Sequence, residues 1–472
     1  MSIADDIING VMPDFDRYKA EGISLDDMDE YGYTPLIETA ITHDAVIAKA
    51  LLDRYANVNI PDVTGRTPLH WAVDNNVLDL VELFLSHGAN PNAYTKGGLS
   101  ILVYPLMRQL TTLKHILYRH GAKIDFALDF IHAKSIGHRF ELKGRVDILT
   151  ADEQFIEVDY EGFMLEFTVE MIKDSLRRFI SSYSTRHLRH TFPPFQAMLE
   201  AMFAASDLLQ LQRHVQRNEE DYAKVAELIA NPLLILPAAS HGHAMGFVRY
   251  KHWWAKIDRG ENSKQEGTVN IYRIGHPERI DVDFIEAFLF KRQPREFFHQ
   301  AINKILDLTP IMKLPISPQI AGNCSWSNIQ ALVPTVYVLW RYEEEGRWFV
   351  DETMDMFAIW LRWDQDRTID ETIQRFYVAP PARQASIASM LASVLFHVCD
   401  AENPHDLKWA EQIVPILMMK EFKFILNSYL EAFCIKKFTR KGNNLLKLLD
   451  DCGVNPDVGV TPIATGLKKK SK

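Results

Sequence analysis

The sequence predicts an α+β protein with several domains: an N-terminal all-α solenoid, a central α+β domain with a small antiparallel sheet, and a C-terminal helical region. Two observations lead to this prediction. A motif recurs every 33 residues near the N-terminus, and a group of short apolar segments between residues 233 and 274 has the length and spacing of strands. The length of 472 residues suits two or three domains.

The domain boundaries are placed where these patterns change along the chain. We expect the solenoid at residues 1–130 and a connector of helices and a hairpin at 131–230, which forms part of the central domain. The core of the central domain is expected at 231–345 and the helical region at 346–472.

The composition favours a folded protein and excludes several classes of function. Apolar residues make up 47% of the chain and aromatic residues 11%, which is enough to build cores. With 62 acidic and 52 basic residues, the net charge of −10 leaves no concentrated basic face, so we expect no direct contact with nucleic acid. The N-terminus lacks the features of a secretory signal, and no apolar stretch is long enough for a membrane span.

The cysteines indicate a reducing compartment. The chain has four of them, Cys324, Cys399, Cys434 and Cys452, and none forms a C-x-x-C pair. In a chain of this length, that number and spacing exclude a disulfide framework and a zinc signature. No glycine-rich phosphate-binding motif is present either, so we expect neither a metal nor a cofactor.

The N-terminal repeat combines a turn glycine with a Thr-Pro helix start. The segment Gly32–Leu36 recurs 33 residues later as Gly65–Leu69, and a degenerate copy follows at Gly98–Leu102. Threonine can cap a helix, and proline suits the first helical position because its missing N–H is not needed there. The apolar stripe of Leu78–Leu85 supplies a second helix, and Gly88 ends that helix.

This period, together with the motif TPLHWA at Thr67–Ala72, resembles the ankyrin repeat, and about four units fit residues 1–130. The resemblance implies that the concave face of the array binds a partner protein. The alternative is that the array only stabilises its neighbours.

A weaker pattern of the same kind lies near the C-terminus. Leu445–Leu449 is followed by Gly453–Pro456 and then by Gly459–Ile463, which resembles a lone ankyrin-type helix and turn. We expect it to pack on the helices of residues 380–450, since a single unit cannot stack alone. The basic tail from Lys468 onwards is expected to be solvated.

The central domain is expected to contain a small antiparallel sheet followed by helices. The segments read as strands are Leu233–Pro237, His243–Tyr250, Trp254–Asp258 and Thr268–Ile274. Residues 282–310 are expected to be helical, and another helix is predicted from Asn328 to Trp340.

Cys324 is the candidate nucleophile, because a thiol just before a helix feels the positive end of the helix dipole, which lowers the pKa of the thiol. His243 begins one predicted strand and Asp258 ends the next, so in a hairpin the two lie side by side. Asp258 can then hold one ring nitrogen of His243 and leave the other for Cys324. Gln319 and the Cys324 backbone N–H are the candidate oxyanion donors.

The order His243, Asp258, Gln319, Cys324 resembles the clan of SUMO- and adenovirus-type cysteine proteases. The chain departs from that clan in detail, since Cys324 lies in Gly-Asn-Cys-Ser-Trp rather than Asp-Cys-Gly, and Ala244 stands where a tryptophan is usual. The resemblance implies cleavage of a peptide or isopeptide bond. The same fold also serves bacterial acetyltransferases, so acyl transfer stays open. So does a structural role for Cys324 in a silent recognition pocket.

The order of domains, with the segment Gly322–Ser327, resembles the ankyrin-repeat effectors of Legionella that the Dot/Icm type IV system delivers into host cells. This resemblance implies that the protein acts in the host cytosol or nucleus and contributes to virulence. It also implies that the ankyrin array binds a host protein.

Overall fold

The computed structural model describes residues 2–455 apart from 214–216, 241, 261–262 and 320–321. Contacts divide the chain into two compact units. The first consists of Met1–Ile131 and Gly162–Trp360, and the second of His132–Glu161 and Leu361–Lys472. The four ranges drawn from the sequence remain a prediction.

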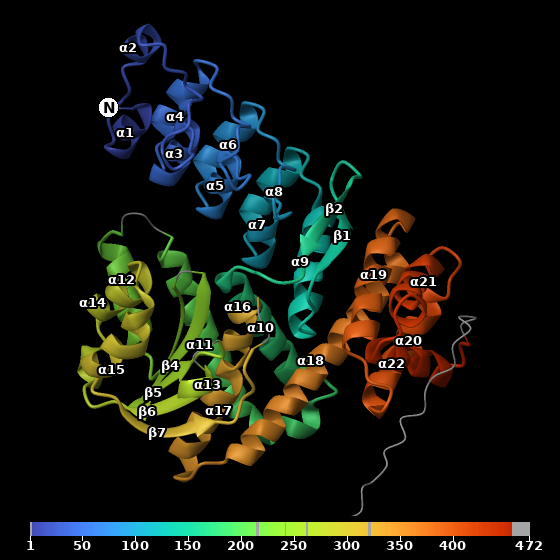
Figure 1. Cartoon of the computed structure of the whole chain (residues 1–472). Helices are drawn as coiled ribbons and strands as arrows, with labels where there is room; N and C mark the ends of the chain where they lie inside the picture. Colours follow the sequence, from blue (N-terminus) through green and yellow to red (C-terminus); the bar gives the residue numbers. More distant parts are fainter. Residues whose placement is uncertain (1, 214–216, 241, 261–262, 320–321, 456–472) are drawn as a thin grey trace, which may run out of the picture. The chain divides into compact units, whose positions relative to one another are not determined.

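The N-terminal part of the first unit consists of stacked helix pairs, drawn in blue to blue-green in Figure 1. The pairs are α1 (Ile3–Ile8) with α2 (Phe15–Ala20), α3 (Pro35–Thr42) with α4 (Ala45–Leu52), α5 (Pro68–Asp74) with α6 (Leu78–Ser86), and α7 (Val103–Met107) with α8 (Thr111–Arg119). Thr34 caps α3 by accepting a hydrogen bond of 3.3 Å from the Ile37 N–H, as the Thr-Pro motif predicts. The predicted all-α solenoid is thus confirmed.

Asparagines one period apart tie consecutive repeats together. The side chain of Asn59 donates to the Gly88 carbonyl at 3.0 Å and accepts from the Asn90 N–H at 2.8 Å. Asn92 makes the same pair of bonds to Gly121 and Lys123 in the following repeat. Each repeat therefore fixes the backbone of the next one.

The central domain is built on a five-stranded antiparallel sheet in the order β3-β4-β5-β6-β7. The strands are β3 (Leu233–Ser240), β4 (His243–Tyr250), β5 (Trp253–Ile257), β6 (Val269–Arg273) and β7 (Thr309–Leu314). The first four were predicted. The edge strand β7 was not, because most of its residues are exposed and the apolar alternation that signals a half-buried strand is lacking.

Helices cover both faces of this sheet (Figure 1). One face buries Leu236, Phe247 and Trp254 in a core shared with the segments that follow β6. The other face packs against the helices that begin at Cys324. That approach is close, because a Cβ at Gly246 would lie 3.1 Å from the Asn328 carbonyl oxygen.

The remaining elements of the first unit surround the sheet. They are α10 (Leu165–Ser181), η1 (Arg186–Thr191), α11 (Phe192–Leu211), α12 (Glu219–Ile229), α13 (Ser263–Glu266), η2 (Pro277–Arg279), α14 (Val282–Ile285), the π-helical segments η3 (Glu286–Phe290) and η4 (Phe297–Ala301), α15 (Ile302–Ile305), α16 (Cys324–Gln330) and α17 (Leu332–Glu345). The helix predicted at Asn328–Trp340 is therefore two helices that start earlier, at Cys324, and run on to Glu345.

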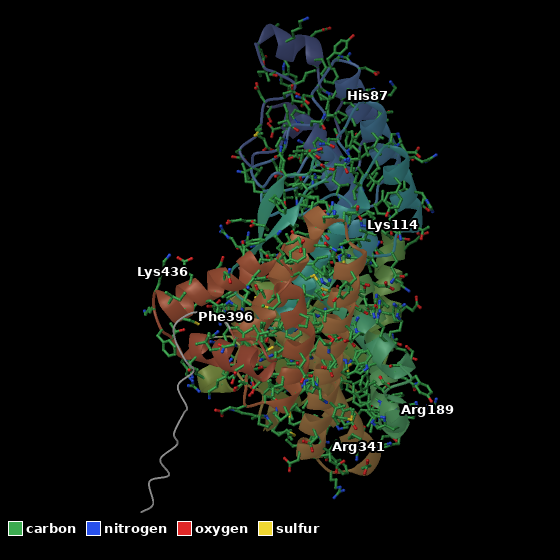
Figure 2. The ribbon with its side chains drawn as sticks, turned by 90° about the vertical axis from the view of Figure 1, so that its right-hand side faces the viewer. His87, Lys114, Arg189, Arg341, Phe396 and Lys436 are labelled. Atoms are coloured by element: carbon green, nitrogen blue, oxygen red, sulfur yellow. The ribbon has the colours of Figure 1, made fainter. Side chains whose placement is uncertain are left out.

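The second unit combines a hairpin with a bundle of helices. The hairpin is β1 (Arg145–Leu149) with β2 (Phe155–Asp159), and the helices are the end of α9 (Ile124–Arg139), most of α18 (Val350–Val378), α19 (Pro381–His397), α20 (Pro404–Leu417), α21 (Lys423–Leu430), η5 (Glu431–Ile435) and α22 (Arg440–Asp451). Phe396 is 3% exposed and packs on Tyr429 and Phe433 in the core of this unit (Figure 2).

Helix α22 contains the leucines of the C-terminal ankyrin-like pattern and packs on α19 and α20. The continuation of that pattern, Gly459–Ile463, and the basic tail lie outside the described residues. Within the part of the chain that the structure describes, no helix is both long and apolar enough to cross a membrane.

Candidate active site

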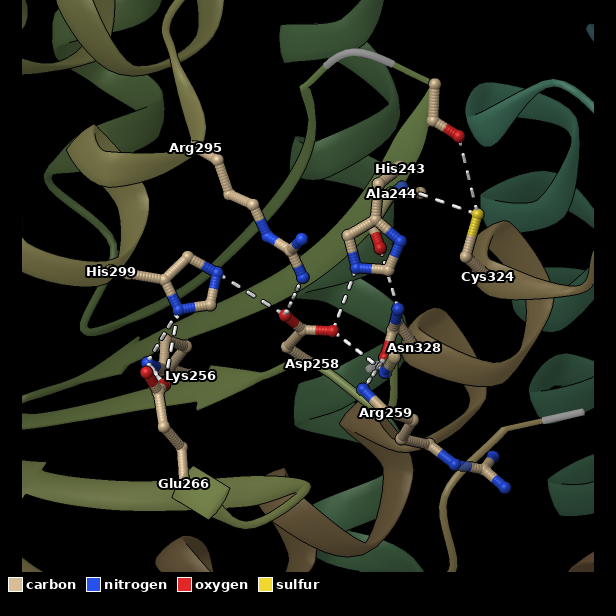
Figure 3. A network of polar contacts seen from close by, with 12 residues as sticks. His243, Ala244, Lys256, Asp258, Arg259, Glu266, Arg295, His299, Cys324 and Asn328 are labelled. Carbon is tan, nitrogen blue, oxygen red and sulfur yellow. Dashed lines mark hydrogen bonds and ion pairs between the residues drawn. The ribbon is translucent and has the colours of Figure 1, made fainter. Parts of the chain in front are cut away.

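The hairpin β4–β5 and the start of α16 bring together three of the residues singled out in the sequence (Figure 3). His243 is the first residue of β4, Asp258 follows directly on β5, and Cys324 is the first residue of α16. The His243 Nε2 atom lies 2.8 Å from Asp258 Oδ1. This is the pairing expected from the two ends of a hairpin.

The sulfur of Cys324 lies beside the start of β4. The Ala244 N–H donates to it at 3.4 Å, and the thiol lies 3.9 Å from the Gly242 carbonyl oxygen. Figure 3 shows the second ring nitrogen of His243, Nδ1, on the side that faces the sulfur. The imidazole therefore stands between the carboxylate and the thiol.

The electrostatics of this group favour a charged pair. The hydrogen bond to Asp258 and the interaction with Cys324 raise the pKa of His243 to about 9. Burial alone raises the pKa of the Cys324 thiol, but the interactions with His243 and the Ala244 N–H outweigh it, so the pKa lies below the usual value. At neutral pH these directions favour an imidazolium beside a thiolate, which is the reactive form of cysteine.

Asn328 fixes α16 against the hairpin. Its side-chain amide donates to the Ala244 carbonyl at 2.6 Å and accepts from the Arg259 N–H at 2.7 Å. Asn328 is fully buried and stands one helical turn after Cys324. It therefore sets the distance between the thiol and the strand that bears His243.

Asp258 is held from the side opposite His243 as well. Its Oδ2 atom lies 3.4 Å from His299 Nε2 and 3.9 Å from an Arg295 nitrogen. The Gly260 N–H donates to Oδ1 at 2.9 Å. Burial raises the pKa of Asp258, but the hydrogen bonds from His243 and His299 bring it far below the usual range, so the group is a carboxylate.

His299 belongs to a polar network behind Asp258, in which His299 and Lys256 are buried and Glu266 is exposed (Figure 3). Its Nδ1 atom lies 3.2 Å from a Glu266 oxygen, and Lys256 donates to that same oxygen at 2.6 Å. His299 was not predicted from the sequence, because nothing near it in the chain links it to Asp258. A histidine within an aromatic run, Phe297-Phe298-His299, is the only local signal.

A pocket of 420 Å³ opens next to His243. Its lining includes Gln319, whose backbone N–H donates to the Arg259 carbonyl at 2.8 Å. The Oε1 atom of Gln319 is buried and has no hydrogen-bond partner among the described residues. Gln319 therefore lines the pocket beside His243, with the oxygen of its side-chain amide uncommitted. Among the residues that the structure describes, no group of His, Cys, Asp or Glu is arranged to hold a metal ion.

The other three cysteines have different surroundings. Cys399 and Cys434 are buried, and Cys452 is half-buried. Burial raises the pKa of all three thiols. Cys324 is thus the one cysteine of the four whose thiol pKa is lowered.

Comparison with known proteins finds short similarities and one that spans almost the whole chain. A family model for ankyrin repeats matches residues 10–95 in three copies. Zygote-specific protein 3 of Chlamydomonas reinhardtii is 38% identical over 85 residues, which are 18% of this chain and 23% of that protein. The B-cell lymphoma 3 protein homolog of Mus musculus is 45% identical over 73 residues, which are 15% of this chain and 16% of that protein. The chain spans less than a quarter of each of these relatives.

One solved structure is similar throughout. The structure of the Legionella effector AnkH is 57% identical to this chain, with a TM-score of 0.90, and the match covers 98% of this chain and 100% of that one.

Proposed function

Because the chain belongs to the family of the Legionella effector AnkH, we propose that it is an effector delivered into host cells, where its ankyrin repeats bind a host protein and Cys324 cleaves a peptide or isopeptide bond. We also propose that the Dot/Icm type IV system delivers the protein and that it acts in the host cytosol or nucleus. The ankyrin repeats themselves indicate protein–protein interaction.

The observation that carries the enzymatic part is the position of His243 between Asp258 and Cys324. A nucleophile needs a base, and the base needs a group that orients it. Here the 2.8 Å contact between His243 Nε2 and Asp258 orients the ring, and Nδ1 is left for the sulfur. The lowered pKa of Cys324 and the raised pKa of His243 suit the same division of roles.

The reaction follows from these positions. The Cys324 thiolate attacks the carbonyl carbon, a C–S bond forms, and the carbonyl oxygen becomes an oxyanion. The Cys324 backbone N–H and the Gln319 amide are proposed to stabilise that oxyanion. When the C–N bond breaks, the His243 imidazolium gives its proton to the leaving amine. Water then attacks the thioester while His243 takes a proton from it, and the C–S bond breaks to restore the thiolate.

The first test compares the four cysteines of one chain. The full-length protein is treated with a limiting amount of iodoacetamide at pH 6.5, and the modification of each cysteine is quantified by mass spectrometry. Cys324 should react first, because its thiol is the one whose pKa is lowered. The buried Cys399 and Cys434 serve as internal controls. Equal reactivity of Cys324 and Cys452 would remove the nucleophile from the proposal.

The second test looks for product. Host-cell lysate is incubated with the wild type or with Cys324→Ala, and new protein N-termini and newly freed lysine amines are compared. Products that appear with the wild type alone support cleavage. If both proteins capture the same host partner and neither gives product, the protein binds without cleaving. Acylated host residues that depend on added acetyl-CoA would indicate transfer instead.

The ankyrin part of the proposal is tested separately. A lesion in the repeat at residues 98–130 should abolish capture of the host protein while Cys324→Ala should retain it. Loss of capture in Cys324→Ala alone would contradict the proposed role of the array.

A further inference from the structure

The charged side chains that line the pocket beside the candidate site are all of one sign. Its volume of 420 Å³ is enough for a short stretch of peptide. The charged side chains among its described lining residues are all basic or potentially basic: Arg259, Lys264, Arg295 and His243. The pocket borders the candidate site at His243 and at Gly322, which stands two residues before Cys324, so a peptide bound across the site can place a side chain among these groups.

Not all of these cations are equally available. Arg259 is committed to the fold, because its guanidinium donates to the Ser317 carbonyl at 2.7 Å and to the Ser327 carbonyl at 3.1 Å. Lys264 is exposed on the short helix α13. The side chain of Arg295 is 39% exposed, and a terminal nitrogen lies 3.9 Å from Asp258, which is at the limit of an ion pair. Lys264 and Arg295 are therefore the cations that can meet a ligand.

Uncommitted polar atoms line the same pocket. The Arg295 Nε and the Ser263 hydroxyl are buried and have no hydrogen-bond partner among the described residues. Leaving a buried polar group without a partner costs free energy. Both groups can donate a hydrogen bond, whereas the Gln319 Oε1 atom in the same lining can only accept one. A ligand that accepts hydrogen bonds from them would remove that cost, and an anion would do so best.

The nearby carboxylates do not neutralise the pocket. Asp258 is 3% exposed and is shared by His243 and His299. Glu266 faces Lys256, whose nitrogen lies 2.6 Å away, and His299. Both carboxylates thus belong to the network behind the site.

We propose that this pocket binds the carboxylate side chain of an acidic residue, aspartate or glutamate, that lies next to the bond attacked by Cys324. Lys264 and the Arg295 guanidinium hold the carboxylate, and the Ser263 hydroxyl donates to it. The inference rests on the proposed function, since it specifies the substrate of the same site. It makes the effector selective for acidic stretches of its host target.

The test compares two pairs of reagents that differ in one negative charge. Iodoacetate and iodoacetamide report the local field at the sulfur, and two peptidyl acyloxymethyl ketones that differ only in glutamate versus glutamine report the pocket. The rate of Cys324 modification in the full chain is measured by intact-mass spectrometry. For each pair, the ratio of the two rates is compared with that of a free small thiol.

For each pair, the rate with the charged reagent divided by the rate with the neutral reagent should be at least about tenfold higher for Cys324 than for the small thiol. In the double variant Lys264→Gln, Arg295→Gln that preference should fall at least about fivefold. The matched control is Arg273→Gln, which removes a cation at the opposite end of the sheet, where Arg273 pairs in register with Trp253. Equal rates for glutamate and glutamine in the wild type, or an unchanged preference in the double variant, would overturn the inference.

A binding arm separates this inference from the enzymatic proposal. Fluorescence anisotropy measures how Cys324→Ala binds labelled peptides that contain glutamate or glutamine. If Cys324 proves unreactive but the glutamate peptide binds at least about tenfold more tightly through Lys264 and Arg295, the nucleophile fails and the pocket stands. If Cys324 is reactive and the two peptides bind equally, the pocket inference alone is wrong.

Discussion

Replacing Gly260 by alanine adds one methyl group at the point where the candidate site is tightest. Gly260 follows Asp258 by two residues, and its N–H donates to Asp258 Oδ1. Its backbone φ lies outside the left-handed range, so alanine can adopt it without strain. The effect of Gly260→Ala is therefore steric, and the added methyl group displaces residues of the candidate site.

The size of the effect follows from three distances. The new Cβ would lie 2.7 Å from His243 Cε1, 3.1 Å from His243 Nε2 and 3.0 Å from Asp258 Oδ1. Carbon atoms pack at about 3.5–4.0 Å, so the ring has to retreat by roughly 1 Å. Such a shift takes Nε2 out of hydrogen-bond range of Asp258. The pKa of His243 should then fall from about 9 towards its ordinary value of 6.5.

The consequence for chemistry is a loss of the imidazolium–thiolate pair. Iodoacetamide reacts with the thiolate, and a thiol with the ordinary pKa of about 8.5 is only about 1% ionised at pH 6.5, which corresponds to a loss of up to about 100-fold in rate. We expect alkylation of Cys324 by iodoacetamide at pH 6.5 to slow by roughly that factor. The rate should recover only as the pH approaches the ordinary range of a thiol, about 8.5.

The assay is the rate of Cys324 alkylation between pH 5 and pH 9, followed by mass spectrometry, together with a thermal melt. The melt checks that the variant is folded, and its midpoint should fall, because the His243–Asp258 pair that raises the pKa of His243 also contributes to stability below about pH 9. The matched control is Gly97→Ala, where the nearest heavy atom to the new Cβ is 4.0 Å away. A folded Gly260→Ala protein with the pH profile of the wild type would refute the geometry argued above.

The same structure supports four further predictions. Asp258→Asn keeps the shape but removes the charge that holds His243, so alkylation of Cys324 should shift to higher pH; an unchanged profile would remove Asp258 from the site. In the wild type, turnover should fall as the pH rises through about 9, where His243 loses the proton that the leaving amine needs. The same raised pKa sets how the stability contributed by His243 depends on pH: this contribution is complete below about pH 6.5 and is lost as the pH passes about 9. Urea titrations at pH 6 and pH 10 test this direction. Equal contributions of His243 to the free energy of unfolding at the two pH values would contradict it. Phe84→Ala removes a fully buried ring from the ankyrin array and should cost about 3–5 kcal/mol in urea unfolding, whereas a loss below about 1 kcal/mol would show that the repeat is not packed as described.

The ankyrin helices and the hairpin could be predicted from the sequence because the patterns that mark them lie within short stretches of the chain. The Thr-Pro starts and the 33-residue period predict the ankyrin helices, since a cap and an apolar stripe act within one repeat. The hairpin that carries His243 and Asp258 was also predicted, because alternation of apolar residues marks each strand. From that hairpin alone, the two side chains could be expected to meet.

Other parts of the site were decided only when distant segments packed together. Asn328 reaches the Ala244 carbonyl from 84 residues away, and His299 reaches Asp258 from another element, so neither contact leaves a local pattern. The edge strand β7 has an exposed sequence and becomes a strand only because β6 offers it hydrogen bonds.

The sequence by itself therefore determined the repeats, most of the sheet and the order of the candidate residues. Tertiary structure decided how the chain divides, since the hairpin β1–β2 at residues 145–159 groups with helices beyond residue 360. It also decided the electrostatics around Asp258 and the charge of the pocket. The physical reason is that caps and periodicity act between near neighbours in the chain, whereas burial and charge depend on every segment that packs nearby.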